Sequence, residues 1–130
     1  MTSIKLTFIV YGDIFDVDEF SKIIGKSPTD FAYKNDILKF RRNTETFWEY
    51  SFQEVLSPYI EESISLFENI ITPSLEDVSS FIQKNNLTSK MLFKIKTDKE
   101  PSPAIVFNNN IINLLNKING WIDLDLYINK

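Results

Sequence analysis

Hydrophobic and polar side chains alternate in three stretches of this chain, with the period of two that is typical of β-strands. The first stretch spans residues 4–11 and ends at Gly12. The second spans residues 90–96, where lysines make one face largely basic, and the third spans residues 121–128. Along the third stretch we expect Ile122, Leu124 and Leu126 to be buried, and Asp123, Asp125 and Tyr127 to be exposed.

Other stretches repeat hydrophobic residues every three or four positions, which predicts amphipathic helices. Residues 17–24 follow Asp16, a predicted N-cap, and end at Gly25, whose missing side chain suits a helix end. Near the other end, residues 111–118 follow Asn108, a second predicted cap. A strand therefore leads into a helix near both ends of the chain.

The middle of the chain predicts two helices in tandem. Ser57 precedes a proline, which is a favourable helix start. The residues around this start predict an apolar helical face that includes Leu56 and Tyr59 and runs to residue 71. The segment Thr72–Ser74 contains Pro73 and predicts an interruption. We expect a second helix to follow, capped by either Thr72 or Ser74 and running from Leu75 to Asn85-Asn86.

Residues 37–41 and 46–52 predict the two arms of one β-hairpin, with a turn between them. Further turns are expected at 27–30 and at 34–36, and a surface loop at 99–103. These elements indicate a single α+β domain over residues 1–130. We expect a mainly antiparallel sheet with helices on one face, in a ferredoxin-like (βαββαβ-type) layout with an extra helix.

Composition removes several classes of chemistry. The chain has neither cysteine nor histidine, which excludes thiol nucleophiles, Cys/His zinc sites and Ser-His-Asp triads. Its start has no basic region followed by a long apolar stretch, and no apolar run reaches the ~18 residues of a membrane span. We therefore expect a cytoplasmic protein without a metal or other cofactor.

Charge is sorted along the chain. Residues 43–83 contain no lysine or arginine, although the net charge of the whole chain is only −4. The carboxylates of this segment are Glu45, Glu49, Glu54, Glu61, Glu62, Glu68, Glu76 and Asp77. A concentrated negative surface attracts basic proteins and repels nucleic acid and anionic membranes. The candidate partner-binding residues are Glu61, Glu68, Glu76 and Asp77, although acidic first turns also stabilise helices and a plain solvated face is an alternative.

Two other groups are candidates for ligand binding. Arg41 lies near Trp48 in the predicted hairpin, where an arginine beside aromatic rings suits a carboxylate or phosphate, although Trp48 equally suits the core. Asp123 and Asp125 share one strand face about 7 Å apart, a separation that inverting glycosidases use, and Tyr127 follows on the same face. A plain exposed strand face explains the carboxylates as well.

Several short motifs, in this order and spacing, resemble a known family over nearly the whole chain. They are Phe15-Asp16, Ile24-Gly25-Lys26-Ser27-Pro28-Thr29, Lys34-Asn35-Asp36, Trp48 and Leu124-Asp125-Leu126-Tyr127. The arrangement resembles the bacterial family catalogued as domain of unknown function 4279. The resemblance implies a small bacterial α+β domain and supplies no catalytic residues.

Together these features favour a non-catalytic protein-binding module, which by analogy with other small bacterial families would be an immunity-type inhibitor. Its acidic helical face would cover a basic protein, and neither nucleic acid nor membrane is expected as a partner. The alternative is a small-molecule-binding protein or minor hydrolase, whose candidate residues are Arg41, Trp48, Asp123, Asp125 and Tyr127.

Overall fold

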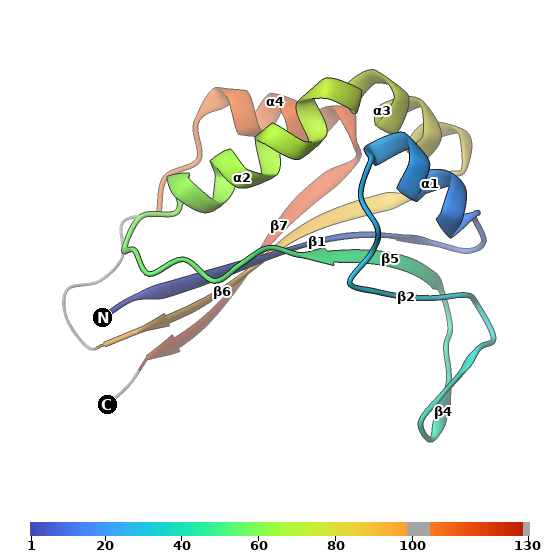
Figure 1. Ribbon diagram of the computed structural model, residues 1–130, viewed down its shortest axis with the longest axis horizontal. Helices are drawn as coiled ribbons and strands as arrows, with labels where there is room; N and C mark the ends of the chain where they lie inside the picture. The colour runs from blue at the N-terminus through green and yellow to red at the C-terminus, as the bar shows by residue number, and fades with distance from the viewer. Residues whose placement is uncertain (99–104, 129–130) are drawn as a thin grey trace.

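The computed structural model describes residues 1–98 and 105–128, in which a layer of helices lies on one face of a five-stranded sheet (Figure 1). The strands of this sheet are β1 (Ser3–Gly12), β2 (Asp30–Ala32), β5 (Thr46–Ser51), β6 (Thr88–Thr97) and β7 (Gly120–Ile128). The helices are α1 (Val17–Ile24), α2 (Glu61–Ile71), the 3-10 helix η1 (Thr72–Ser74), α3 (Leu75–Lys84) and α4 (Asn109–Lys117). Two short strands, β3 (Ile37–Leu38) and β4 (Arg41–Arg42), pair only with each other.

The strand order in the large sheet is β2-β5-β1-β6-β7. The pairs β2–β5, β5–β1 and β1–β6 are antiparallel, whereas β6 and β7 are parallel and are connected through α4. The predicted α+β class is thus confirmed, with a mostly antiparallel sheet and helices on one face. The ferredoxin-like layout is not confirmed, because this sheet is mixed.

The core lies between the sheet and the helices. On β1, Ile4, Leu6, Phe8 and Val10 are buried beneath the helices, while the residues between them face the opposite side. Aromatic rings fill this layer: Phe8 lies 4.8 Å from Phe67 of α2, and Phe20 of α1 lies 4.9 Å from Trp48, measured between ring centroids. Because the core forms on one side, the other face of the sheet is left open.

The predicted helix ends are confirmed at three places. Asp16 Oδ1 accepts a hydrogen bond from the Glu19 amide at 3.1 Å, and Asn108 Oδ1 accepts one from the Ile111 amide at 3.1 Å. Gly25 ends α1 with φ of 77°, a left-handed conformation that glycine adopts without strain. These local signals fixed α1 and the start of α4 within a residue or two.

The start of α2 was predicted wrongly. The helix begins at Glu61, and Leu56 and Tyr59, which were expected on its apolar face, are exposed. The Ser57 hydroxyl accepts a hydrogen bond from the Tyr59 amide at 3.1 Å, so it stabilises a local turn ahead of the helix. The segment Thr72–Ser74 forms a 3-10 turn that joins α2 directly to α3.

The predicted hairpin was also wrong in its pairing. Strand β5 pairs with β1 and with β2, a strand that includes Asp30 from a predicted turn. The residues 37–42 instead form their own tight hairpin, which Figure 1 shows hanging below the sheet, away from the helices. The turn at 34–36 is confirmed, because Asn35 has φ of 76°.

Strand β7 does not bury the residues that the alternation predicted. Leu124 and Leu126 face the helical side, opposite Phe93 and Ile95 of β6, yet both remain about half exposed. The reason is that β7 is the last strand of the sheet, with a covering neighbour on one side only. The loop predicted at 99–103 lies outside the described residues.

Candidate functional site

The face of the sheet opposite the helices, called the open face below, carries aromatic and charged side chains on all five strands. The strand register places them on one side. Its aromatic residues are Tyr11, Phe47, Trp121 and Tyr127. Its basic residues are Lys5, Lys90, Lys94 and Lys96, and its acidic residues are Asp30, Glu49, Asp123 and Asp125. No helix in residues 1–98 or 105–128 covers this face (Figure 1).

The side chains of β6 and β7 contact one another across the open face. Lys90 Nζ lies 5.1 Å from the centroid of the Trp121 ring and 3.9 Å from a carboxylate oxygen of Asp123. Trp121 Nε1 donates a hydrogen bond to the Tyr11 hydroxyl at 3.0 Å. These cation–π and polar contacts hold the Trp121 ring over the sheet in a defined orientation.

The second part of the site is the hairpin arm, defined here as residues 37–42. Its base is held by backbone hydrogen bonds from the Asn35 amide to the Asn43 carbonyl (2.8 Å) and from the Asn43 amide to the Asp36 carbonyl (2.7 Å). The Asn43 side chain, which is buried, donates to the carbonyls of Tyr33 (3.0 Å) and Glu45. The arm therefore leaves the sheet from an ordered base.

A second set of bonds ties this base to the end of β1. The Thr46 hydroxyl donates to the Asp13 carbonyl at 3.0 Å and accepts from the Lys34 amide at 3.0 Å. Lys34 also forms an ion pair with the Asp13 side chain. Since these residues flank the arm on both sides in the sequence, they position it relative to the large sheet.

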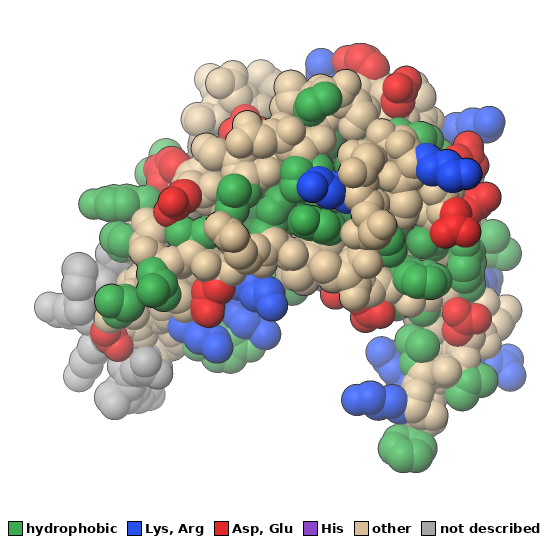
Figure 2. All heavy atoms as spheres, viewed as in Figure 1, with side chains coloured by type: hydrophobic (Ala, Val, Ile, Leu, Met, Phe, Trp, Pro, Cys, Tyr) green, Lys and Arg blue, Asp and Glu red, His purple; other side chains and the backbone are tan. Residues whose placement is uncertain are grey.

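The tip of the arm is apolar and exposed. Lys39 and Phe40 form the two-residue turn; the Phe40 side chain is fully exposed, and nearby Ile37 is 70% exposed. Lys39 has φ of 53°, a conformation that costs a residue with a side chain roughly 1–2 kcal/mol. Figure 2 shows the arm projecting beside an arch beneath the sheet, with hydrophobic and basic side chains along it.

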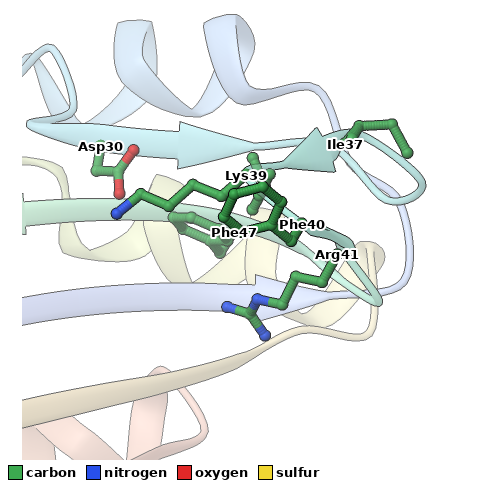
Figure 3. Close-up of a pocket in the computed structure, with 7 residues that line it drawn as sticks. Asp30, Ile37, Lys39, Phe40, Arg41 and Phe47 are labelled. Atoms are coloured by element: carbon green, nitrogen blue, oxygen red, sulfur yellow. The ribbon is translucent and has the colours of Figure 1, made fainter.

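A hollow of about 670 Å³ lies between the arm and the open face. It is lined by Asp30, Ile37, Leu38, Lys39, Phe40, Arg41 and Phe47. In Figure 3 the Lys39 side chain extends toward Asp30, and Arg41 points away from Asp30. A neighbouring hollow of about 380 Å³ shares Arg41 and Phe47 and also reaches Lys90. The two hollows, which share Arg41 and Phe47, are together called the groove below.

Glu49 lies beside this groove with a perturbed pKa. Its partner across the β2–β5 ladder is Asp30. Partial burial, and next the like charge of Asp30, raise the pKa of Glu49, whereas Lys90 and Lys5 lower it. The protonated form of Glu49 is thus favoured more than in a free side chain.

The predicted acidic face is spread over the helical layer. Glu61 and Asp77 are exposed, and Glu68 is half-buried. Glu76 forms an exposed ion pair with Lys117 of α4, with 3.7 Å between charged atoms, so a lysine from outside the acidic segment partly neutralises it. Figure 2 shows acidic side chains spaced along this layer. A partner-binding role for these residues stays a prediction.

The alternative ligand residues do not form one site. Arg41 lines the groove next to β5, whereas Asp125 and Tyr127 lie on β7 at the far edge of the sheet. Trp48 is fully buried, and its Nε1 donates a hydrogen bond to the Ser21 hydroxyl at 3.0 Å, so it is a core residue and not a ligand platform.

Tyr127 and Asp125 pair with each other. The Tyr127 hydroxyl donates to a carboxylate oxygen of Asp125 at 2.8 Å. This bond, followed by the charge of Asp125, raises the pKa of the Tyr127 hydroxyl. A hydrolase role for Asp123 and Asp125 stays a prediction.

The sequence analysis missed Lys39, Phe40 and Phe47. The incorrect hairpin register placed Phe40 inside a long strand and hid the two-residue turn. The available signal was the pair of asparagines, Asn35 and Asn43, that bracket a short segment with its own strand character.

Two searches of the described residues were negative. Residues 1–98 and 105–128 hold no cluster of three or more acidic side chains that could bind a metal ion. Within the same ranges, no helix has the length and apolar character that crossing a membrane requires.

Comparison with known proteins gives one match. The family model described as Domain of unknown function (DUF4279) matches residues 2–129. No curated protein and no solved structure matches the chain.

Proposed function

We propose that this chain, which belongs to the family described as Domain of unknown function (DUF4279), is a protein-binding module. The partner would lie in the groove between the hairpin arm and the open face. The observation that carries this proposal is the fully exposed Phe40 ring, held on an ordered arm beside a groove that Arg41 and Phe47 line.

The arm favours a protein over a small ligand. Burying a phenylalanine side chain contributes about 1.5–3 kcal/mol to the free energy of binding. A protein in the groove could cover both Phe40 and Ile37, which are exposed in the free chain. Because hydrogen bonds around Asn43 already order the base of the arm, little conformational entropy would be lost on binding.

The side chains of the groove also match those of protein interfaces. Aromatic residues and arginine are enriched at binding hot spots, and Phe40, Phe47, Arg41 and Tyr11 line the two hollows. Lysines on the open face alternate with carboxylates, so the face has no single sign of charge. This balance supports the expectation that nucleic acid is not the partner.

The acidic helical face is a second candidate surface, for the basic partner of an immunity-type inhibitor. Its supporting observation is that Leu56 and Tyr59 are exposed immediately before Glu61 and Glu62, which combines apolar anchors with negative charge. The hollow volume of about 670 Å³ also suits a small molecule, the third possibility to be tested.

Affinity capture from the native host tests the three possibilities. The baits are the intact protein, a Phe40→Ala/Arg41→Ala variant and a Glu61→Lys/Glu68→Lys variant. Ile112→Ala is the matched control, because it removes a half-exposed aliphatic side chain from α4, on the other side of the sheet.

A protein that the intact chain and the control retain, and that only the arm variant loses, supports the groove. If only the Glu61→Lys/Glu68→Lys variant fails to retain the protein, the binding surface is the acidic helical face and not the groove. A photo-reactive residue at position 40 should cross-link to the same protein. A low-mass compound found in the purified protein by native mass spectrometry, with no retained protein, would refute a protein-binding role.

A further inference from the structure

Strand β7 is a long edge strand, with one neighbouring strand among the described residues. All nine of its residues pair with β6, and no backbone hydrogen bond joins its other edge to residues 1–98 or 105–128. Every second residue of such a strand directs its N–H and C=O groups outward, over a length of about 30 Å. This edge is a template on which another strand can pair.

The helical side of this edge is apolar and incompletely covered. Leu124, Leu126 and Ile128 are 43%, 49% and 51% exposed, whereas Phe93 and Ile95, directly opposite the two leucines on β6, are 0% exposed. Strand β6 covers one side of Leu124, Leu126 and Ile128. An additional strand next to β7 would cover the other side with its own side chains.

The open side of the same edge is acidic. Asp123 and Asp125 lie between Trp121 and Tyr127, whose rings receive the ammonium groups of Lys90 and Lys94 at 5.1 and 5.8 Å. A basic side chain on an added strand would stand about 5 Å from these carboxylates and about twice as far from the lysines of β6. At physiological salt the more distant repulsion is largely screened, so attraction dominates.

Strand β6 shows which sequence fits β7. Its residues Met91, Phe93 and Ile95 face the helices, while Lys90, Lys94 and Lys96 face the open side, and Lys90 pairs with Asp123 at 3.9 Å. The complement of β7 is therefore a strand in which basic and apolar residues alternate.

A second copy of this chain fits the edge less well. The antiparallel register that pairs the whole of β7 with itself is centred on Leu124, and it places Asp123 of each copy opposite Asp125 of the other. Like charges directly opposite each other destabilise a strand pair.

We infer that the free edge of β7 accepts an extended segment of a partner protein, in which lysine or arginine alternates with aliphatic or aromatic residues. This interaction uses a surface other than the groove beside the arm and does not depend on the proposed function.

The test uses a synthetic peptide with the sequence of β6, TSKMLFKIKT, added to the full chain. The control peptide replaces the three lysines with glutamate. Hydrogen exchange should show that alternate amides of β7 become at least tenfold slower with the lysine peptide, and the glutamate peptide should bind at least about tenfold more weakly. Both measurements use the unaltered protein, so they do not depend on how a variant folds.

An Asp123→Lys/Asp125→Lys variant should weaken binding of the lysine peptide by about tenfold, whereas Phe40→Ala should leave it unchanged. Equal affinity for both peptides would overturn the inference. Protection confined to the arm, or faster exchange in β6 through displacement of the native strand, would also overturn it. The inference would also be overturned if a dimer protected the β7 amides from hydrogen exchange before any peptide was added.

Discussion

Replacement of Asn43 by alanine should loosen the hairpin arm and leave the core folded. The Asn43 side chain is buried and donates two hydrogen bonds, to the carbonyls of Tyr33 and Glu45. Alanine removes both donors, although the Tyr33 carbonyl would still accept the hydrogen bond from the Asp36 amide at 3.0 Å. The backbone bonds from Asn43 to Asp36 and from Asn35 to Asn43 would remain.

A neutral hydrogen bond contributes about 0.5–1.5 kcal/mol net, so the loss of two predicts a destabilisation of the arm of about 1–3 kcal/mol. At about 1.4 kcal/mol per tenfold change, the amides of residues 37–42 should exchange roughly 5- to 150-fold faster. Hydrogen exchange followed by mass spectrometry measures this change, and circular dichroism should show that the core remains folded.

Thr44→Ala is the matched control, because Thr44 is exposed, lies beside Asn43 and has no side-chain hydrogen bond to a described residue. In the Thr44→Ala variant, the amides of residues 37–42 should exchange hydrogen at the same rate as in the unaltered protein. If Asn43→Ala also leaves the rate unchanged, the side chain does not order the base. The argument that a preordered arm binds its partner at little entropic cost would then be wrong.

Three further predictions concern stability. Asp16→Ala removes the cap of α1 and should lower the free energy of unfolding by about 1 kcal/mol in urea denaturation. Phe67→Ala leaves a cavity beside Phe8 and should lower it by about 3–5 kcal/mol, a loss that a value under 1 kcal/mol would contradict. Because the folded state raises the pKa of Glu49, its ionisation opposes folding; Glu49→Gln should therefore stabilise the protein at pH 7, and the gain should fade as pH falls below the ordinary value of 4.5. A gain that persists in acid would exclude this electrostatic cause.

The difference between the predicted and observed sites has one physical origin. Sequence spacing placed Glu61 and Glu68 on one helical side and Asp123 and Asp125 on one strand face, and the structure agrees with both local placements. It did not show that Lys117 approaches Glu76, or that a groove forms beside Arg41. Both features depend on contacts between residues far apart in the chain.

Local interactions were enough to determine much of the fold from the sequence alone. The period of side chains identified β1, β6 and α1, and the caps at Asp16 and Asn108 act within three residues. These signals can be recognised in the sequence because each depends only on residues that are close together in the chain. They also support the α+β class. The absence of cysteine and histidine is equally a property of the sequence.

Only the tertiary structure decided which strands are neighbours. Strand β5 pairs with β1 and β2, so residues 37–42 pair with each other and form the arm. Leu124 and Leu126 are about half exposed because β7 lies at the end of the sheet. Alternation shows that a strand has two faces, but burial of either face requires another element to cover it. Long-range packing decides whether that requirement is met, which is why neither the groove beside the arm nor the free edge of β7 could be predicted from the sequence.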